Sequence, residues 1–181
     1  MIPVAIAATS PLLQWRGPIY IAAGFAGVLA LCMLLVQPLL ARSALPDLSA
    51  ARSRVWHRWV GMVLVALVLL HVAGLWITSP PDVIDVLLFR SPTPFSVWGA
   101  IAMWAVLGAA ALAMLRSRLR IRPRTWRRMH VALASLTVGG TVAHAMLIEG
   151  TMGTVSKALL CAAVVGATAW AISKRRRGNA L

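Results

Sequence analysis

Residues 54–76 read RVWHRWVGMVLVALVLLHVAGLW, an almost wholly apolar run that carries two histidines, His57 and His71. The run is long enough to cross a bilayer as a helix, which takes about 20 residues. The whole chain has 181 residues, of which 60% are hydrophobic and 12% are charged, and its mean hydropathy is +0.83. This composition is typical of an integral membrane protein rather than of a soluble one.

Five apolar runs of this kind follow one another along the chain, at residues 18–40, 55–77, 95–115, 129–148 and 154–173. They predict an all-α integral membrane protein, a bundle of about five transmembrane helices within one domain, residues 18–173. Residues 1–17 lack the basic start of a signal peptide, so we expect an interfacial segment there. We interpret residues 174–181 as a basic cytoplasmic tail, and the proline-bracketed stretch 83–89 as a short helix on the membrane surface.

The formal net charge is +14, yet the basic side chains lie in the gaps between apolar runs rather than along one polar face. This distribution is typical of cytoplasmic loops, so nucleic acid is not the expected partner and membrane lipid is. The basic stretches are Arg42, Arg52 and Arg54; Arg116, Arg118, Arg120, Arg122, Arg124, Arg127 and Arg128; and Lys174, Arg175, Arg176 and Arg177. We therefore expect the N-terminus outside and the C-terminus in the cytoplasm, in a bacterial inner membrane.

All four histidines of the chain lie in two of the five runs, with the same spacing. His57 and His71 are fourteen residues apart, and so are His130 and His144 in residues 127–147, RRMHVALASLTVGGTVAHAML. On a helix this spacing places both side chains within about 40° of one face and about 21 Å apart along the axis. One helix separates the two runs, so both run in the same direction. His57 and His130 are then predicted at one depth near the cytoplasm, and His71 and His144 at another near the outside.

Two imidazoles at one depth, one from each helix, suit the two axial positions of a haem iron. The sequence therefore predicts two b-type haems, an inner one on His57 and His130 and an outer one on His71 and His144. Four arginines near the inner pair, Arg54, Arg58, Arg127 and Arg128, are candidate contacts for haem propionates, although each is first a topology signal. A zinc or copper site is less favoured, because each pair brings two nitrogens and no nearby Cys, Asp or Glu.

The histidines and the glycines near them also have simpler interpretations. Each histidine alone is compatible with a hydrogen bond to a neighbouring helix or with a proton relay. Gly61, Gly74 and Gly140 each lie about one turn from a histidine. They either let a flat ring approach the backbone or mark helix–helix contacts.

The two histidine runs resemble those of the ferric reductase-like transmembrane family. Residues 56–75, WHRWVGMVLVALVLLHVAGL, are similar to its first haem helix, and residues 126–147, WRRMHVALASLTVGGTVAHAML, to its second. The family includes ferric reductases, NADPH oxidases and the haem subunit of the periplasmic methionine sulfoxide reductase system. The resemblance implies electron transfer from a cytoplasmic flavin, through the inner and then the outer haem, to an acceptor outside.

The chain has no glycine-rich phosphate loop and no evident FAD and NADPH domain after KRRRGNAL, so it resembles the haem-only members. We expect the chain to be an electron-transfer subunit of an oxidoreductase, with no catalytic residue of its own. Its donor is then a cytoplasmic flavoprotein, a dehydrogenase or a quinone, with flavin or quinone held by a partner or a separate site. Two alternatives are a quinol-reactive dihaem anchor of a larger dehydrogenase and a non-redox scaffold subunit of a larger membrane complex.

Overall fold

The computed structural model describes residues 5, 7–9 and 11–177, and within them the regular structure is helical, with no strand. Residues 1–4, 6 and 10 of the expected interfacial segment and 178–181 of the expected tail lie outside this description. The elements are η1 (Pro11–Leu13), α2 (Pro18–Ala41), α3 (Ala50–Thr78), α4 (Pro80–Leu87), α5 (Pro94–Met114), α6 (Pro123–Leu147) and α7 (Thr154–Arg177).

Five of these helices, α2, α3, α5, α6 and α7, are long and apolar enough to cross a membrane. The predicted all-α bundle with five candidate transmembrane helices is therefore confirmed within the described residues. The short helix between α3 and α5 also forms, although it begins at Pro80, three residues before the predicted stretch.

The two histidine helices are longer at their basic ends than the apolar runs predicted. Helix α3 begins at Ala50 rather than at residue 55, because the Ser49 side chain caps it by accepting from the Arg52 backbone N–H at 3.4 Å. Helix α6 begins at Pro123 rather than at residue 129, and proline is favoured in the first turn, where its missing N–H costs nothing. His57 and His130 therefore both lie two turns inside their helices.

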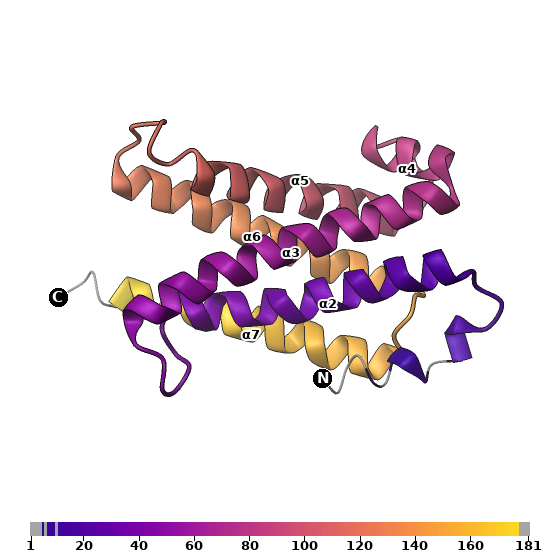
Figure 1. Cartoon of the computed structure of the whole chain (residues 1–181), viewed down its shortest axis with the longest axis horizontal. Helices are drawn as coiled ribbons and strands as arrows, with labels where there is room; N and C mark the ends of the chain where they lie inside the picture. The colour runs from indigo at the N-terminus through magenta and orange to yellow at the C-terminus, as the bar shows by residue number, and fades with distance from the viewer. Residues whose placement is uncertain (1–4, 6, 10, 178–181) are drawn as a thin grey trace.

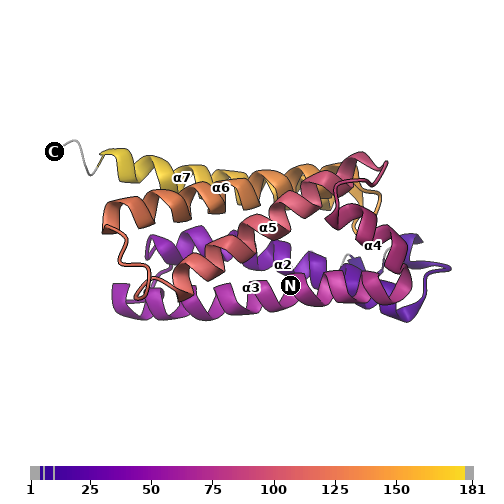
Figure 2. The ribbon, with the colours of Figure 1, turned by 90° about the horizontal axis from the view of Figure 1, so that it is seen from above.

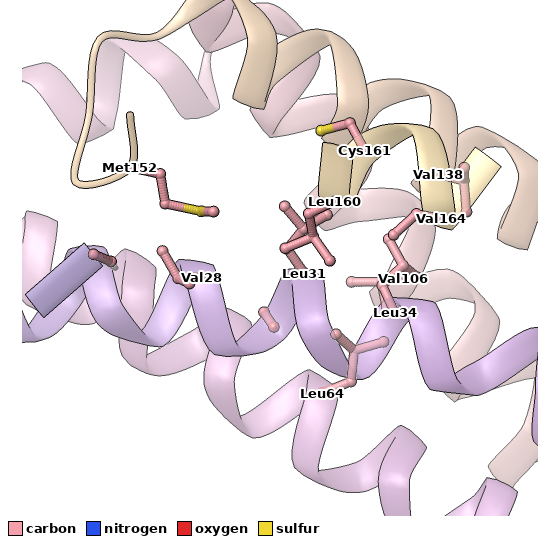
Figure 3. Close-up of a cluster of buried hydrophobic side chains, with 12 residues drawn as sticks. Val28, Leu31, Leu34, Leu64, Val106, Val138, Met152, Leu160, Cys161 and Val164 are labelled. Carbon is pink, nitrogen blue, oxygen red and sulfur yellow. The ribbon is translucent and has the colours of Figure 1, made fainter. Parts of the chain in front are cut away.

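The helices associate as two hairpins and one bridging helix. Helix α2 packs along α3, α5 packs along α6, and α7 contacts both α2 and α6 (Figure 1). Buried aliphatic side chains from all five helices meet in the middle of the bundle, among them Leu31, Leu64, Val106, Val138 and Val164 (Figure 3). This core places the two hairpins opposite one another.

Helices α3 and α6 face each other but do not pack directly. Their backbones make few or no close contacts. Helix α3 packs against α2 instead, and α6 packs against α5. Figure 2 shows α2 and α3 on one side of the bundle and α6 and α7 on the other. The histidine-bearing faces are thus separated by a space that side chains or a bound group must fill.

The connections rich in arginine lie at one end of the bundle. In both views the α2–α3 loop, the α5–α6 loop and the last turn of α7 are at the left, whereas α4 is at the right (Figures 1 and 2). The acidic residues Asp82 and Asp85 belong to α4. The bundle is therefore strongly basic at one end, and both histidine helices start there.

Candidate functional site

The four histidines meet as two pairs, each with one ring from α3 and one from α6. The ring centroids of His57 and His130 are 6.4 Å apart, with 72° between the ring planes. Those of His71 and His144 are also 6.4 Å apart, at 78°. The first pair lies towards the basic end of the bundle and the second towards α4. The structure thus brings together the same residues that spacing and helix direction placed at equal depth.

Three of the four rings are held by a backbone carbonyl of the hairpin partner. Nδ1 of His71 donates to the Ala23 carbonyl of α2 at 2.7 Å, and Nδ1 of His144 donates to the Phe95 carbonyl of α5 at 2.9 Å. Nδ1 of His57 lies 3.2 Å from the Gln37 carbonyl of α2. Because a carbonyl only accepts, Nδ1 carries the proton, and Nε2 keeps its lone pair for another ligand.

Gln37 makes two hydrogen bonds to His57, and it was not predicted from the sequence as part of the site. The Gln37 side-chain amide donates to the backbone carbonyl of His57 at 3.3 Å, and the Gln37 backbone carbonyl accepts from the His57 ring. The signal was present, because a glutamine inside an apolar membrane run is uncommon and usually has a partner.

His130 is positioned differently from the other three histidines. Its Nδ1 is buried without a hydrogen bond of ordinary geometry, and the backbone of Ala109 on α5 is the group that faces it. The ring instead stacks on Trp126 one turn earlier, with centroids 5.2 Å apart and 7° between the planes. Trp126 in turn donates to the Leu112 carbonyl at 3.0 Å and lies under the Arg116 guanidinium. Stacking thus orients this ring where a hydrogen bond does not.

Two glycines on the partner helices give the second histidine pair its space. A Cβ on Gly27 of α2 would lie 3.1 Å from Nδ1 of His71. A Cβ on Gly99 of α5 would lie 2.8 Å from Nδ1 of His144. Each glycine is one turn after the carbonyl that its histidine bonds, at Ala23 and Phe95. The missing side chains therefore let the imidazoles reach the backbone.

Two glycines near the histidines in sequence have another role. A Cβ on Gly74 would lie 2.7 Å from the Ala23 side chain, and one on Gly140 would lie 2.9 Å from the Trp98 carbonyl. These contacts join α3 to α2 and α6 to α5. Of the two interpretations of Gly74 and Gly140, the structure therefore favours helix–helix contact over space for a flat ring. Gly61 likewise faces Gln37 of α2, at 3.3 Å from its amide nitrogen.

A cavity of about 500 Å³ borders the second pair, His71 and His144. Its volume is within the range of ligand sites, roughly 300–1,000 Å³. Its wall is mainly apolar, with Leu31, Leu64 and Val106 deep in the bundle, and it reaches Asp82 and Thr93 towards α4. A flat apolar group with polar substituents at one edge would match this distribution.

The four arginines proposed for propionate contact are exposed. Arg54 lies in the second turn of α3 and Arg58 in the third, and Arg127 and Arg128 lie in the second turn of α6. They are at the same end of the bundle as His57 and His130. Their contact with a cofactor stays a prediction.

The donor set fits a haem better than a bare metal ion. The described residues contain no group of three or more His, Cys, Asp or Glu that could hold a metal ion. A haem iron needs only two protein ligands, because the macrocycle supplies the rest. With about 2 Å for a metal–imidazole bond and about 1 Å from each nitrogen to its ring centre, two coaxial imidazoles have centroids roughly 6 Å apart. Both observed pairs agree with that separation.

Comparison with known proteins gives one match. The family model described as ferric reductase like transmembrane component matches residues 24–141, more than half of the chain. The matched segment runs from α2 into α6, contains three of the four histidines and ends three residues before His144. No curated protein and no solved structure matches.

Proposed function

Because the chain belongs to the ferric reductase-like transmembrane family, we propose that it is a dihaem b-type cytochrome that carries electrons across the membrane. Domains of this family bind haem in general and have a membrane electron-transfer role. The observation that carries the dihaem assignment is the presence of two separate His–His pairs, each with ring centroids 6.4 Å apart.

Each residue of the proposed sites has a defined role. The Nε2 atoms of His57 and His130 would hold an inner haem, and those of His71 and His144 an outer one. Hydrogen bonds at Nδ1 orient three of the rings and make their Nε2 atoms better ligands. Arg54, Arg58, Arg127 and Arg128 would supply charge for the inner propionates. When bound, each haem supplies a one-electron iron couple.

The proposed orientation places the basic end in the cytoplasm of a bacterial inner membrane, with the N-terminus outside. An electron moving outward then travels down the membrane potential, which favours it by about 2.3 kcal/mol per 100 mV. The donor would be a flavoprotein or dehydrogenase on the cytoplasmic side, and the acceptor would bind outside. The exposed arginines between α5 and α6 are a suitable docking surface for an acidic donor.

The test of the assignment is haem content and coordination. The purified protein is expected to contain two b-type haems per chain, both low-spin and six-coordinate, because each iron has two imidazoles. Pyridine haemochrome assay and ferric absorption spectra measure these properties. A content of one haem, or a high-spin ferric spectrum from intact protein, would argue against two bis-histidine sites, and a colourless protein would favour the scaffold alternative.

Gly99 provides a test of the second pair that leaves the ligands in place. In Gly99→Ala the new methyl group would meet the His144 ring, so the ring must move and its bond to Phe95 must lengthen. Overpacking of this kind costs about 1–3 kcal/mol. We expect weaker retention and an altered ferric spectrum for one haem, with the other unchanged. Gly139→Ala on α6 is the matched control, because nothing lies within 4 Å of a Cβ there. Equal spectra for both variants would contradict this role of Gly99.

A quinol-reactive cytochrome is the second candidate function. The cavity beside His71 and His144 extends to Asp82, Asp85 and Thr93 near α4, which would offer polar partners to a quinol head group. Direct reduction of the purified protein by a soluble quinol analogue, without a protein donor, would support this candidate. Absence of reduction by quinol, together with reduction by a flavoprotein, would support the first.

A further inference from the structure

Lys157 is a buried cation in the first turn of α7. Only 7% of its surface is exposed, and it is the one charged side chain buried among those that the structure describes. Its Nζ donates to the Ile148 carbonyl, just past the end of α6, at 2.7 Å. Ile148 lies one turn after His144 and its backbone N–H bonds the His144 carbonyl. The ammonium is thus close in the chain to a proposed haem ligand.

The ammonium of Lys157 is incompletely paired. It has three N–H donors, and the structure gives it one acceptor. No ion pair joins it to a carboxylate of the described residues. A buried charge without a counter-charge is strongly unfavourable, and buried charges in proteins are therefore usually paired.

Lys157 lines the same cavity as His71 and His144. The deep wall of this cavity is aliphatic and offers no anion. The carboxylates that line it, Asp82 and Asp85, belong to α4 and form no ion pair with Lys157. The partner of the ammonium is therefore expected to arrive with the group that fills the cavity.

We propose that Lys157 binds a propionate carboxylate of the haem held by His71 and His144. This inference rests on the proposed function. A haem carries two carboxylates on one edge of an otherwise apolar ring, which matches one buried cation beside an apolar cavity. A charge-assisted N–H···O bond is roughly twice as strong as a neutral one. The outer haem would thus have one buried lysine, whereas the inner haem has exposed arginines near it.

A purely structural role for Lys157 makes a different prediction. A cation near a helix C-terminus satisfies an orphan carbonyl and interacts well with the helix dipole. That role accounts for the bond to Ile148 and uses one donor. It involves no carboxylate of the cofactor, so it predicts the same loss whether or not the cofactor carries free carboxylates.

The experiment compares Lys157→Met with wild type in protein prepared without haem and reconstituted with haem b or with its dimethyl ester. With haem b, Lys157→Met is expected to lose the outer haem about tenfold more readily. Its outer midpoint potential should also fall, because an uncompensated carboxylate stabilises the ferric iron. With the neutral ester, wild type and Lys157→Met should retain the outer haem equally well. Lys157→Arg should retain most of the wild-type behaviour.

Cys161→Ala is the matched control, because Cys161 lies one turn along α7, is buried and has no charge. It should shift neither the potential nor haem retention. Equal losses with haem b and with the ester would assign Lys157 to capping alone and overturn the proposal, as would no loss with either. A shift that appears only when acetate is added would assign the site to a diffusible carboxylate instead. If wild type itself binds fewer than two haems, the dihaem function fails rather than this inference.

Discussion

Replacing either His71 or His144 with Ala is expected to remove one and the same haem, and replacing either His57 or His130 the other. Haem content should fall from two to one per chain in each variant, because an iron that keeps a single imidazole is bound weakly and turns high-spin. The pairs run between α3 and α6, with ring centroids 6.4 Å apart in both cases. Redox-resolved absorption spectra of the four variants measure which component is lost.

The double variant His71→Ala/His144→Ala provides the sharpest form of this test. It should lose no more haem than either single variant, because the two ligands act as a unit and their effects are not additive. The remaining haem, with its native spectrum, serves as the check that the chain has folded. Leu136→Ala, at an exposed position of α6, should keep both haems. If His57→Ala and His71→Ala remove the same component, the pairing across helices is wrong.

Two single-cysteine variants are expected to label from opposite sides of the membrane. In a background with Cys32→Ser and Cys161→Ala, Arg120→Cys lies in the basic α5–α6 connection and Arg90→Cys in the α4–α5 connection. Each variant removes one positive charge, so they are matched. Under the positive-inside rule, an impermeant maleimide should label position 90 in spheroplasts and position 120 only in inverted vesicles. The expected difference is close to all-or-none.

Detergent-solubilised protein is the control for reactivity, since both cysteines should label there. The reversed pattern would place the arginine-rich end outside the cell. It would therefore contradict the proposal that a cytoplasmic donor docks at the arginine-rich end. Labelling of both positions from one side would contradict the five-span topology itself. The reversed pattern would leave the histidine pairing unaffected, because the pairing depends on how the helices pack and not on which side of the membrane each end lies.

The helices could be predicted from the sequence because hydropathy over about 20 residues governs membrane insertion. The equal depth of His57 and His130 followed from helix direction and the helical period, and the structure has these rings side by side. The apolar runs did not predict where α3 and α6 begin. A run of high hydropathy ends where arginines begin, whereas the helix continues as far as its N-cap. Ser49 and Pro123 supply those ends from outside the apolar runs.

The sequence alone determined the class of the protein, its five candidate spans and the grouping of its histidines, since each depends on the spacing of residues along one chain. Only the tertiary structure decided what holds the rings. The acceptors at Ala23, Gln37 and Phe95 are backbone carbonyls, which every residue has and no pattern marks. Gly27 and Gly99 matter only because another helix brings an imidazole against them. Lys157 is a lone cation in the sequence, and it becomes informative when the fold buries it beside a cavity, where water can no longer solvate its charge.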